Sequence, residues 1–109
     1  MDDLIAMAEK LGKQIAADAR TMELKQAQKA VDQDEEAKKL VEAYRVQAER
    51  ISELTRQNKP IEVVDKHKLR ELEQQIGLNG KLKELTRRQV DFVDMMRKIK
   101  QAIDSQLEV

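Results

Sequence analysis

Few side chains in this sequence can do chemistry, and none of them has a partner at a useful spacing. His67 is the only histidine, so the chain cannot form the paired histidines of a His-x-x-x-His zinc site. Val64 stands three residues before it, where the di-iron site of a helical bundle has a glutamate. We therefore interpret His67 as a surface residue and expect no metal site.

The dipeptide Gly80-Lys81 resembles the end of a phosphate-binding loop, but the rest of that motif is missing. Gln75 occupies the position of the first glycine, and Leu82 occupies the position of the serine or threonine that binds magnesium. The preceding segment also has a helical pattern, whereas the motif follows a strand. We interpret the region as the junction between two helices.

The carboxylate pairs and the serines lack the geometry of a catalytic site. Neighbours on a helix point about 100° apart, so Glu35 and Glu36 diverge, and Glu71 and Glu73 point about 200° apart. The serines have no histidine placed to activate them. The sequence therefore predicts a protein that is not an enzyme, with no catalytic residue, no cofactor and no small-molecule substrate.

Composition favours long solvated helices over a compact mixed core. Charged residues make up 39% of the 109 residues and aromatic residues 2%, and there are only three glycines and one proline to interrupt regular structure. The 21 basic residues balance 21 acidic ones, so net charge calls for neither a nucleic acid nor a membrane as partner. Cysteine is absent, which excludes disulfides and thiolate metal sites built from this chain alone.

The start of the chain gives no sign of export. Asp2 and Asp3 make it acidic where a signal peptide is basic, and no stretch approaches the roughly 20 apolar residues of a membrane span. We expect a cytoplasmic protein that has no contact with a membrane.

Apolar residues recur at helical spacing along the whole chain. They predict a single all-α domain, 1–109, built as an antiparallel bundle of four to five helices with two long ones, at about 3–18, 21–31, 35–58, 62–76 and 79–106. The sequence leaves open whether the first two are separate helices or one kinked helix. Asp34 and Asn79 are the expected caps of the two long helices, and Thr21 is a candidate cap for the second. Gly77 is expected to end the fourth helix in a left-handed turn, with Leu78 packing against it.

Each predicted helix has an expected apolar face. In the first helix this face consists of Leu4, Ala8, Leu11 and Ile15; in the third, of Ala37, Val41, Tyr44, Ala48, Ile51 and Thr55; and in the fourth, of Ile61, Val64, Leu69, Leu72 and Ile76.

The last helix carries the longest apolar pattern, which is typical of a coiled-coil seam. Its positions alternate at spacings of four and three, and we expect an oligomer or partner interface at Leu82, Leu85, Gln89, Phe92, Met96, Ile99 and Ile103. Of the two adjacent methionines, Met96 is expected to pack and Met95 to lie at the edge. Gln89 is the polar exception, and it either fixes the register of association or lies exposed where helices cross.

The last two helices also contain basic clusters, at 66–70, 87–88 and 97–100, which suggest an alternative function. Such clusters can bind phosphates, and an RNA-associated accessory protein would use them in this way. Acidic residues are interspersed among them, and the only aromatic residues, Tyr44 and Phe92, occupy seam positions. We therefore favour a solvated, ion-paired surface and do not expect direct binding of nucleic acid.

From Leu4 to Ile103 the chain resembles the YlbF/YmcA family of small all-helical bacterial regulators. Four features in order carry the resemblance: residues 11–15 (Leu-Gly-Lys-Gln-Ile), residues 27–31 leading into the acidic helix start at 34–40, the loop at 59–62 (Lys-Pro-Ile-Glu), and the helix that opens at Asn79 and reads Leu82, Leu85, Gln89, Phe92 and Met96. The chain departs from the family pattern at Gly80, where proline is frequent, and at Met22, where an aromatic residue is usual.

The resemblance implies a non-enzymatic, self-associating regulator that acts with partner proteins. Family members act in developmental control and RNA processing, and some help to hold an iron–sulfur cluster, for which this chain has no cysteine to offer. We expect a homo-oligomer, a dimer, together with an unidentified protein partner. A structural coiled-coil spacer, which would only self-associate, is a further alternative.

Overall fold

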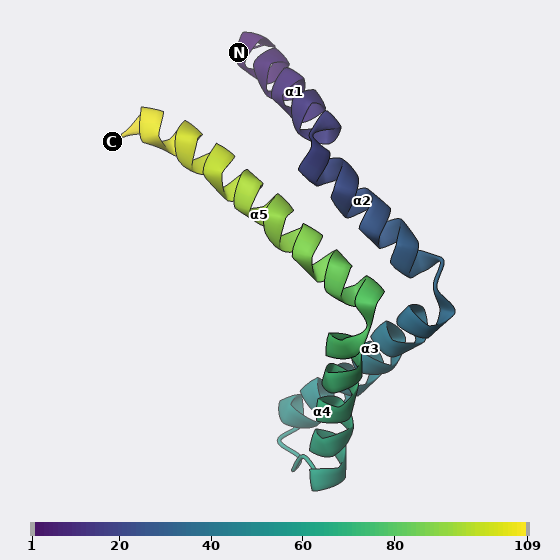
Figure 1. Cartoon of the computed structure of the whole chain (residues 1–109). Coiled ribbons are helices and arrows are strands. Elements are labelled where there is room, and N and C mark those ends of the chain that lie inside the picture. Colours follow the sequence, from purple (N-terminus) through teal and green to yellow (C-terminus); the bar gives the residue numbers. More distant parts are fainter. Residues whose placement is uncertain (1, 109) are drawn as a thin grey trace. The chain divides into compact units, whose positions relative to one another are not determined.

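The computed structural model of the chain describes residues 2–108 and is all-α over that range, as the sequence predicts. Its helices are α1 (Asp2–Ala17), α2 (Ala19–Asp32), α3 (Glu35–Arg56), α4 (Val63–Leu78) and α5 (Gly80–Leu107), shown in chain order in Figure 1. As expected, α3 and α5 are the longest, with 22 and 28 residues. The prediction of an all-helical fold with two long helices is confirmed.

The first two predicted helices are separate, and the break between them falls at Asp18. The carboxylate of Asp18 accepts a hydrogen bond from the Arg20 main-chain N–H at 2.9 Å, and its carbonyl accepts from the N–H groups of Thr21 and Met22. Thr21 lies inside α2 and is buried, so the prediction that it caps this helix is wrong. Asp18 starts α2 instead, because a short carboxylate satisfies free N–H groups in the first turn.

The acidic start of α3 has the predicted cap. Asp34 has an extended backbone, and its side chain accepts from the Ala37 N–H at 2.9 Å. The Lys81 ammonium lies 2.8 Å from the other carboxylate oxygen of Asp34. One side chain therefore caps α3 and ties it to the first turn of α5.

Asn58 ends α3 in a way that the sequence analysis missed. It has a φ of 56°, in the left-handed region, while the Lys59 N–H donates to the Leu54 carbonyl and the Asn58 N–H donates to the Thr55 carbonyl. This hydrogen-bond pair is the Schellman motif, in which asparagine is the commonest substitute for glycine.

The junction between α4 and α5 differs from the prediction at one residue. Gly77 is helical, α4 continues to Leu78, and Leu78 is exposed, so the predicted left-handed turn at Gly77 is wrong. The chain instead leaves the helix at Asn79, whose extended backbone (φ −76°, ψ 119°) needs no glycine. Asn79 then accepts from the Leu82 N–H at 3.0 Å, which confirms it as the cap of α5.

Contacts divide the described residues into two compact units. The first unit comprises residues 2–28 and 85–108, that is α1, most of α2 and most of α5. The second comprises Lys29–Glu84, with α3 and α4 packed against each other. A single domain would mean that the two units unfold together, and this expectation stays a prediction.

In the second unit, most residues of the apolar faces predicted for α3 and α4 are covered, and the exceptions are Val41, Thr55 and Val64. Val41 and Val64, both assigned to apolar faces, are 44% and 73% exposed. Gln47 and Asp65 are buried in this unit instead. The other predicted members of the α4 face, including Leu69 and Leu72, are half-buried as expected.

Candidate protein-interaction surface

The predicted seam of the last helix divides into covered and uncovered positions. Within the second unit Leu82 is buried. In the first unit Leu85, Phe92 and Ile99 are half-buried, and three positions are exposed: Gln89, Met96 and Ile103. One edge of the seam therefore packs within the chain, while the other edge is free to contact a second molecule.

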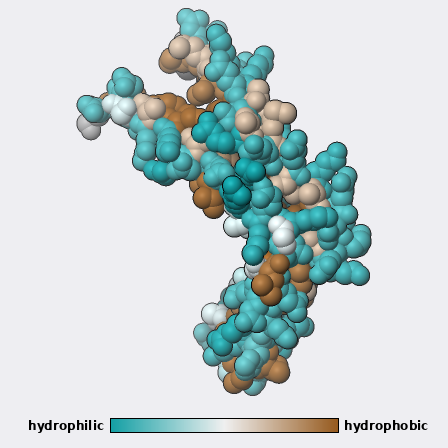
Figure 2. All heavy atoms as spheres, viewed as in Figure 1, coloured by the Kyte–Doolittle hydropathy of each residue, from teal (hydrophilic) through white to brown (hydrophobic). Residues whose placement is uncertain are grey.

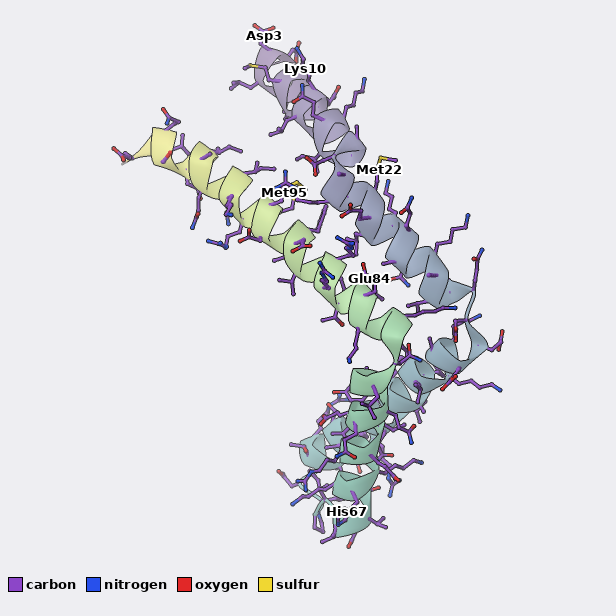
Figure 3. The ribbon with its side chains drawn as sticks, in the orientation of Figure 1. Asp3, Lys10, Met22, His67, Glu84 and Met95 are labelled. Atoms are coloured by element: carbon purple, nitrogen blue, oxygen red, sulfur yellow. The ribbon has the colours of Figure 1, made fainter. Side chains whose placement is uncertain are left out.

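The two methionines of α5 have the opposite arrangement to the one predicted. Met95 is 4% exposed, whereas Met96 is 37% exposed. Figure 3 shows Met95 on the side of α5 that faces the other helices of the first unit. The apolar face that packs within the unit is centred on Met95, Ile99 and Phe92. It shares Phe92 and Ile99 with the heptad seam, and its centre is rotated from that of the seam by roughly 50–60°.

Gln89 is exposed within the chain, in agreement with one of the two interpretations of this residue. It lines a shallow depression on the outer surface of α5 together with Val90 and Val93, which are also exposed. A role of Gln89 in the register of association stays a prediction.

A groove of about 380 Å³ lies between α1 and α5 in the first unit. Apolar side chains from both helices line it, among them Leu11, Ile15, Met95 and Ile99. No residue of α1 is buried, and of its predicted apolar face only Ile15 is half-buried. Figure 2 shows apolar surface in this region, among largely hydrophilic surroundings. Hence α1 has an amphipathic sequence but little of its apolar face is covered by the chain itself.

One ion pair joins α2 to α5 within the same unit, and two others lie within α5. The Arg88 guanidinium lies 2.8 Å from a Glu23 carboxylate oxygen, and Arg88 occupies a half-buried position on the inner side of α5. Arg97 and Lys98 both pair with Asp94, at 2.6 and 3.0 Å. Three cations of the predicted basic clusters are thus paired with carboxylates of the chain.

Among the carboxyl groups described in the first unit, Asp18 has the largest shift in pKa. The Arg20 guanidinium donates to both carboxylate oxygens, at 2.9 and 3.0 Å, and the Arg20 main-chain N–H donates as well. These hydrogen bonds stabilise the ionised form and lower the pKa of Asp18 to about 2. The break between α1 and α2 is therefore held by a charged cap at neutral pH.

The second unit contains a buried polar cluster that the sequence analysis missed. The Gln47 amide donates to the main-chain carbonyl of Asp65 at 2.9 Å, and the Arg50 Nε donates to the Asp65 carboxylate at 3.0 Å. The hydrogen bond from Arg50 lowers the pKa of Asp65. The only sequence signal was the spacing of three residues between Gln47 and Arg50 on α3, and nothing in the sequence indicated Asp65 as their partner.

The remaining candidates for chemistry stay apart in space. His67 is exposed on α4, and residues 2–108 contain no group of three or more histidine, aspartate or glutamate side chains arranged to hold a metal ion. Among the same residues, no helix combines the length and the apolarity needed to cross a membrane.

The solved structures that share this fold include two Bacillus proteins. Bacillus subtilis RicA, solved in complex with RicF, superposes with a TM-score of 0.86 at 19% sequence identity, covering 96% of this chain and 93% of RicA. A protein of unknown function (DUF964) from Bacillus stearothermophilus gives a TM-score of 0.76 at 23% identity, covering 97% and 93% of the two chains. At these identities the likeness establishes the fold.

A search of curated proteins finds no match. The family model described as "Control of competence regulator ComK, YlbF/YmcA" matches residues 4–108, nearly the whole chain. This match and the shared helical fold confirm the resemblance noted in the sequence: the chain belongs to the YlbF/YmcA family.

Proposed function

We propose that this protein is a non-enzymatic regulatory adaptor that self-associates and binds a partner protein through its helical surfaces. The observation that carries the proposal is the uncovered apolar surface of α1 and α5, which a helical chain of this kind hides by association. The family description, control of a competence regulator, and the complex of RicA with RicF support an adaptor that acts by assembly.

The proposal includes the statement that the protein catalyses no reaction. The carboxylates with lowered pKa values, such as Asp18 and Asp65, are engaged in caps and ion pairs that stabilise the fold. Structural ion pairs also shift pKa values, and Asp18 and Asp65 have such partners in Arg20 and Arg50. A cytoplasmic location stays an expectation from the sequence.

The test is affinity capture of the full chain from a native lysate of the source organism, after cross-linking, with and without ribonuclease. We expect a stoichiometric protein partner that survives ribonuclease, and its loss when Met96 or Ile103, on the exposed edge of the seam, is replaced by aspartate. Partners that disappear with ribonuclease would support the RNA-associated alternative. Recovery of the protein alone would support a structural spacer.

A further inference from the structure

We propose that Asn79 is a site of spontaneous deamidation, and that the folded chain suppresses the reaction by using this side chain as the cap of α5. The inference concerns a covalent modification and is independent of the proposed function. Asn79 is followed by Gly80. An asparagine before a glycine is especially prone to deamidation, because glycine has no side chain to hinder attack by its own main-chain nitrogen.

The reaction is an internal substitution at the side-chain amide of Asn79. The Gly80 main-chain nitrogen gives its proton to a base in solution and attacks the Asn79 Cγ, forming a new C–N bond. The amide nitrogen leaves as ammonia, with a proton from solvent. Water then opens one of the two C–N bonds of the five-membered imide, which gives aspartate or isoaspartate. The balance is water consumed and ammonia released, without oxidation or reduction.

The attacking nitrogen lies at the start of α5, where the helix leaves it accessible. Gly80 is the first helical residue, so its N–H has no carbonyl one turn earlier in α5 to bind. Gly80 is exposed, and a Cβ placed on it would meet no atom within 4 Å. Base and water can therefore reach this main-chain nitrogen.

The cap holds Asn79 in a conformation that does not react. Closing the imide ring requires the Gly80 nitrogen to eclipse the Asn79 Cβ, and at the observed ψ of 119° this nitrogen is rotated far from that position. The Asn79 side-chain oxygen also accepts from the Leu82 N–H at 3.0 Å, which fixes the side chain over the first turn of α5. Deamidation therefore requires the cap to open, and its rate reports how often the junction between α4 and α5 opens.

Asn58 is the other asparagine of the chain, and it is not a comparable site. The residue after it is Lys59, whose side chain hinders attack. The Lys59 N–H also donates to the Leu54 carbonyl at 2.9 Å, so this nitrogen is bound in the turn that ends α3. Asn58 therefore serves as an internal control within the same molecule.

The two products have different effects on the cap. Aspartate keeps a short side-chain oxygen at position 79, and its negative charge is stabilised at the N-terminal end of α5. Isoaspartate carries the main chain through Cβ and Cγ, which inserts an additional carbon atom between residues 79 and 80. The insertion changes the geometry that places the side-chain oxygen on the Leu82 N–H. A chain that has formed isoaspartate therefore cannot rebuild the cap of α5.

The test incubates the full chain at mildly alkaline pH, in buffer and in guanidinium chloride. Peptide mass spectrometry with separation of the aspartate and isoaspartate forms measures the conversion of Asn79 and Asn58. We expect Asn79 to convert faster than Asn58 in denaturant, and to convert at least about fivefold more slowly in buffer, the factor that corresponds to a cap of ordinary strength.

Gly80→Pro tests the imide route. The proline nitrogen carries no proton and cannot form the imide, so conversion of Asn79 should be lost in buffer and in denaturant. Proline is favoured at the first position of a helix, and the extended backbone of Asn79 is the conformation required before it, so the fold should be retained. Circular dichroism checks this.

A further pair of variants changes the opening of the junction. Leu82 is 5% exposed, so Leu82→Ala should loosen the first turn of α5 and move the rate at Asn79 in buffer towards the rate in denaturant. Leu78→Ala is the matched control, because Leu78 lies on the other side of the junction and is 80% exposed. Both variants should convert at the wild-type rate in denaturant.

Several results would overturn the inference. Equal rates at Asn79 in buffer and in denaturant would show that the cap does not suppress the reaction. No faster conversion at Asn79 than at Asn58 in denaturant, or wild-type conversion in Gly80→Pro, would exclude the site or the imide route. Equal acceleration by Leu78→Ala and Leu82→Ala would show that opening of the cap does not control the rate. These outcomes are independent of whether a partner protein is captured.

Discussion

Gln47 and Asp65 are both buried, and the Gln47 amide donates to the Asp65 main-chain carbonyl across the contact between α3 and α4. The carbonyl of Asp65 lies in the first turn of α4, so this bond fixes how far the two helices can slide along each other. Replacing either residue with an apolar one changes both the packing and the hydrogen bonding of the second unit.

Gln47→Ala should lower the free energy of unfolding by about 1–3 kcal/mol, because it removes the hydrogen bond from the Gln47 amide to the Asp65 carbonyl and opens a small cavity. Urea denaturation followed by circular dichroism measures this change. The matched control is Gln74→Ala on the exposed surface of α4, for which we expect a change within about 0.5 kcal/mol. Equal effects of the two substitutions would contradict the structural role of Gln47.

Asp34→Ala should destabilise the protein by about 1 kcal/mol through loss of the α3 cap. Asp34→Asn keeps an oxygen that can accept from the Ala37 N–H while losing the ion pair with Lys81, and we expect it to retain most of the stability. Thermal unfolding of the two variants separates the cap from the ion pair. Equal losses in Asp34→Asn and Asp34→Ala would show that the charge is the main contribution.

Acidification should weaken the junction between α1 and α2. The pKa of Asp18 is lowered to about 2 from an ordinary value near 3.8, so the folded state binds fewer protons than the unfolded state in this range. The stabilisation by Asp18 is therefore complete above about pH 4 and is lost as the pH falls towards 2. Carbon-detected NMR titration should show a pKa near 2 for Asp18, returning towards its ordinary value in Arg20→Ala.

Met95→Ala should destabilise the first unit by about 2–5 kcal/mol, as expected for removal of a buried side chain. Met22→Ala provides the matched comparison, because Met22 is exposed on α2 and its loss opens no cavity (Figure 3). We expect its effect to be within about 0.5 kcal/mol. Denaturant unfolding of the two variants under identical conditions measures the difference.

The two units should unfold together if the chain is a single domain. Tyr44 is the only tyrosine and lies in the second unit, so its near-ultraviolet signal reports that unit alone. Hydrogen exchange of α5 amides after residue 85 reports the first unit. Coincident transitions would support one domain, and two separated transitions would show that the units are independent.

The two long helices and most helix ends were predictable from the sequence, because the signals are local, but the sequence left open whether α1 and α2 are separate helices. Asp34 and Asn79 cap helices through side chains that reach N–H groups three residues away, whatever the tertiary structure. Gly77 shows the limit of such signals, since a glycine permits a left-handed turn but does not require one.

The inner faces of the helices were less predictable, because pattern alone does not rank an apolar residue against a polar one with a partner. Gln47 is buried because its amide binds the carbonyl of Asp65. Val41 is apolar and lies on the same helix, but it is exposed. Similarly, Met95 packs within the first unit, although Met96 is the methionine that stands at a heptad position. Which face of a helix is buried depends on the element that packs against it, and that element comes from a distant part of the chain.

The thin covering of α1 has a consequence for how long each molecule survives. A helix with no buried residue opens easily, and an opened helix is a substrate for proteases. A molecule that binds neither a second copy nor a partner protein would therefore be degraded sooner than an assembled one. The cellular level of the protein would then follow the level of the molecules that it binds.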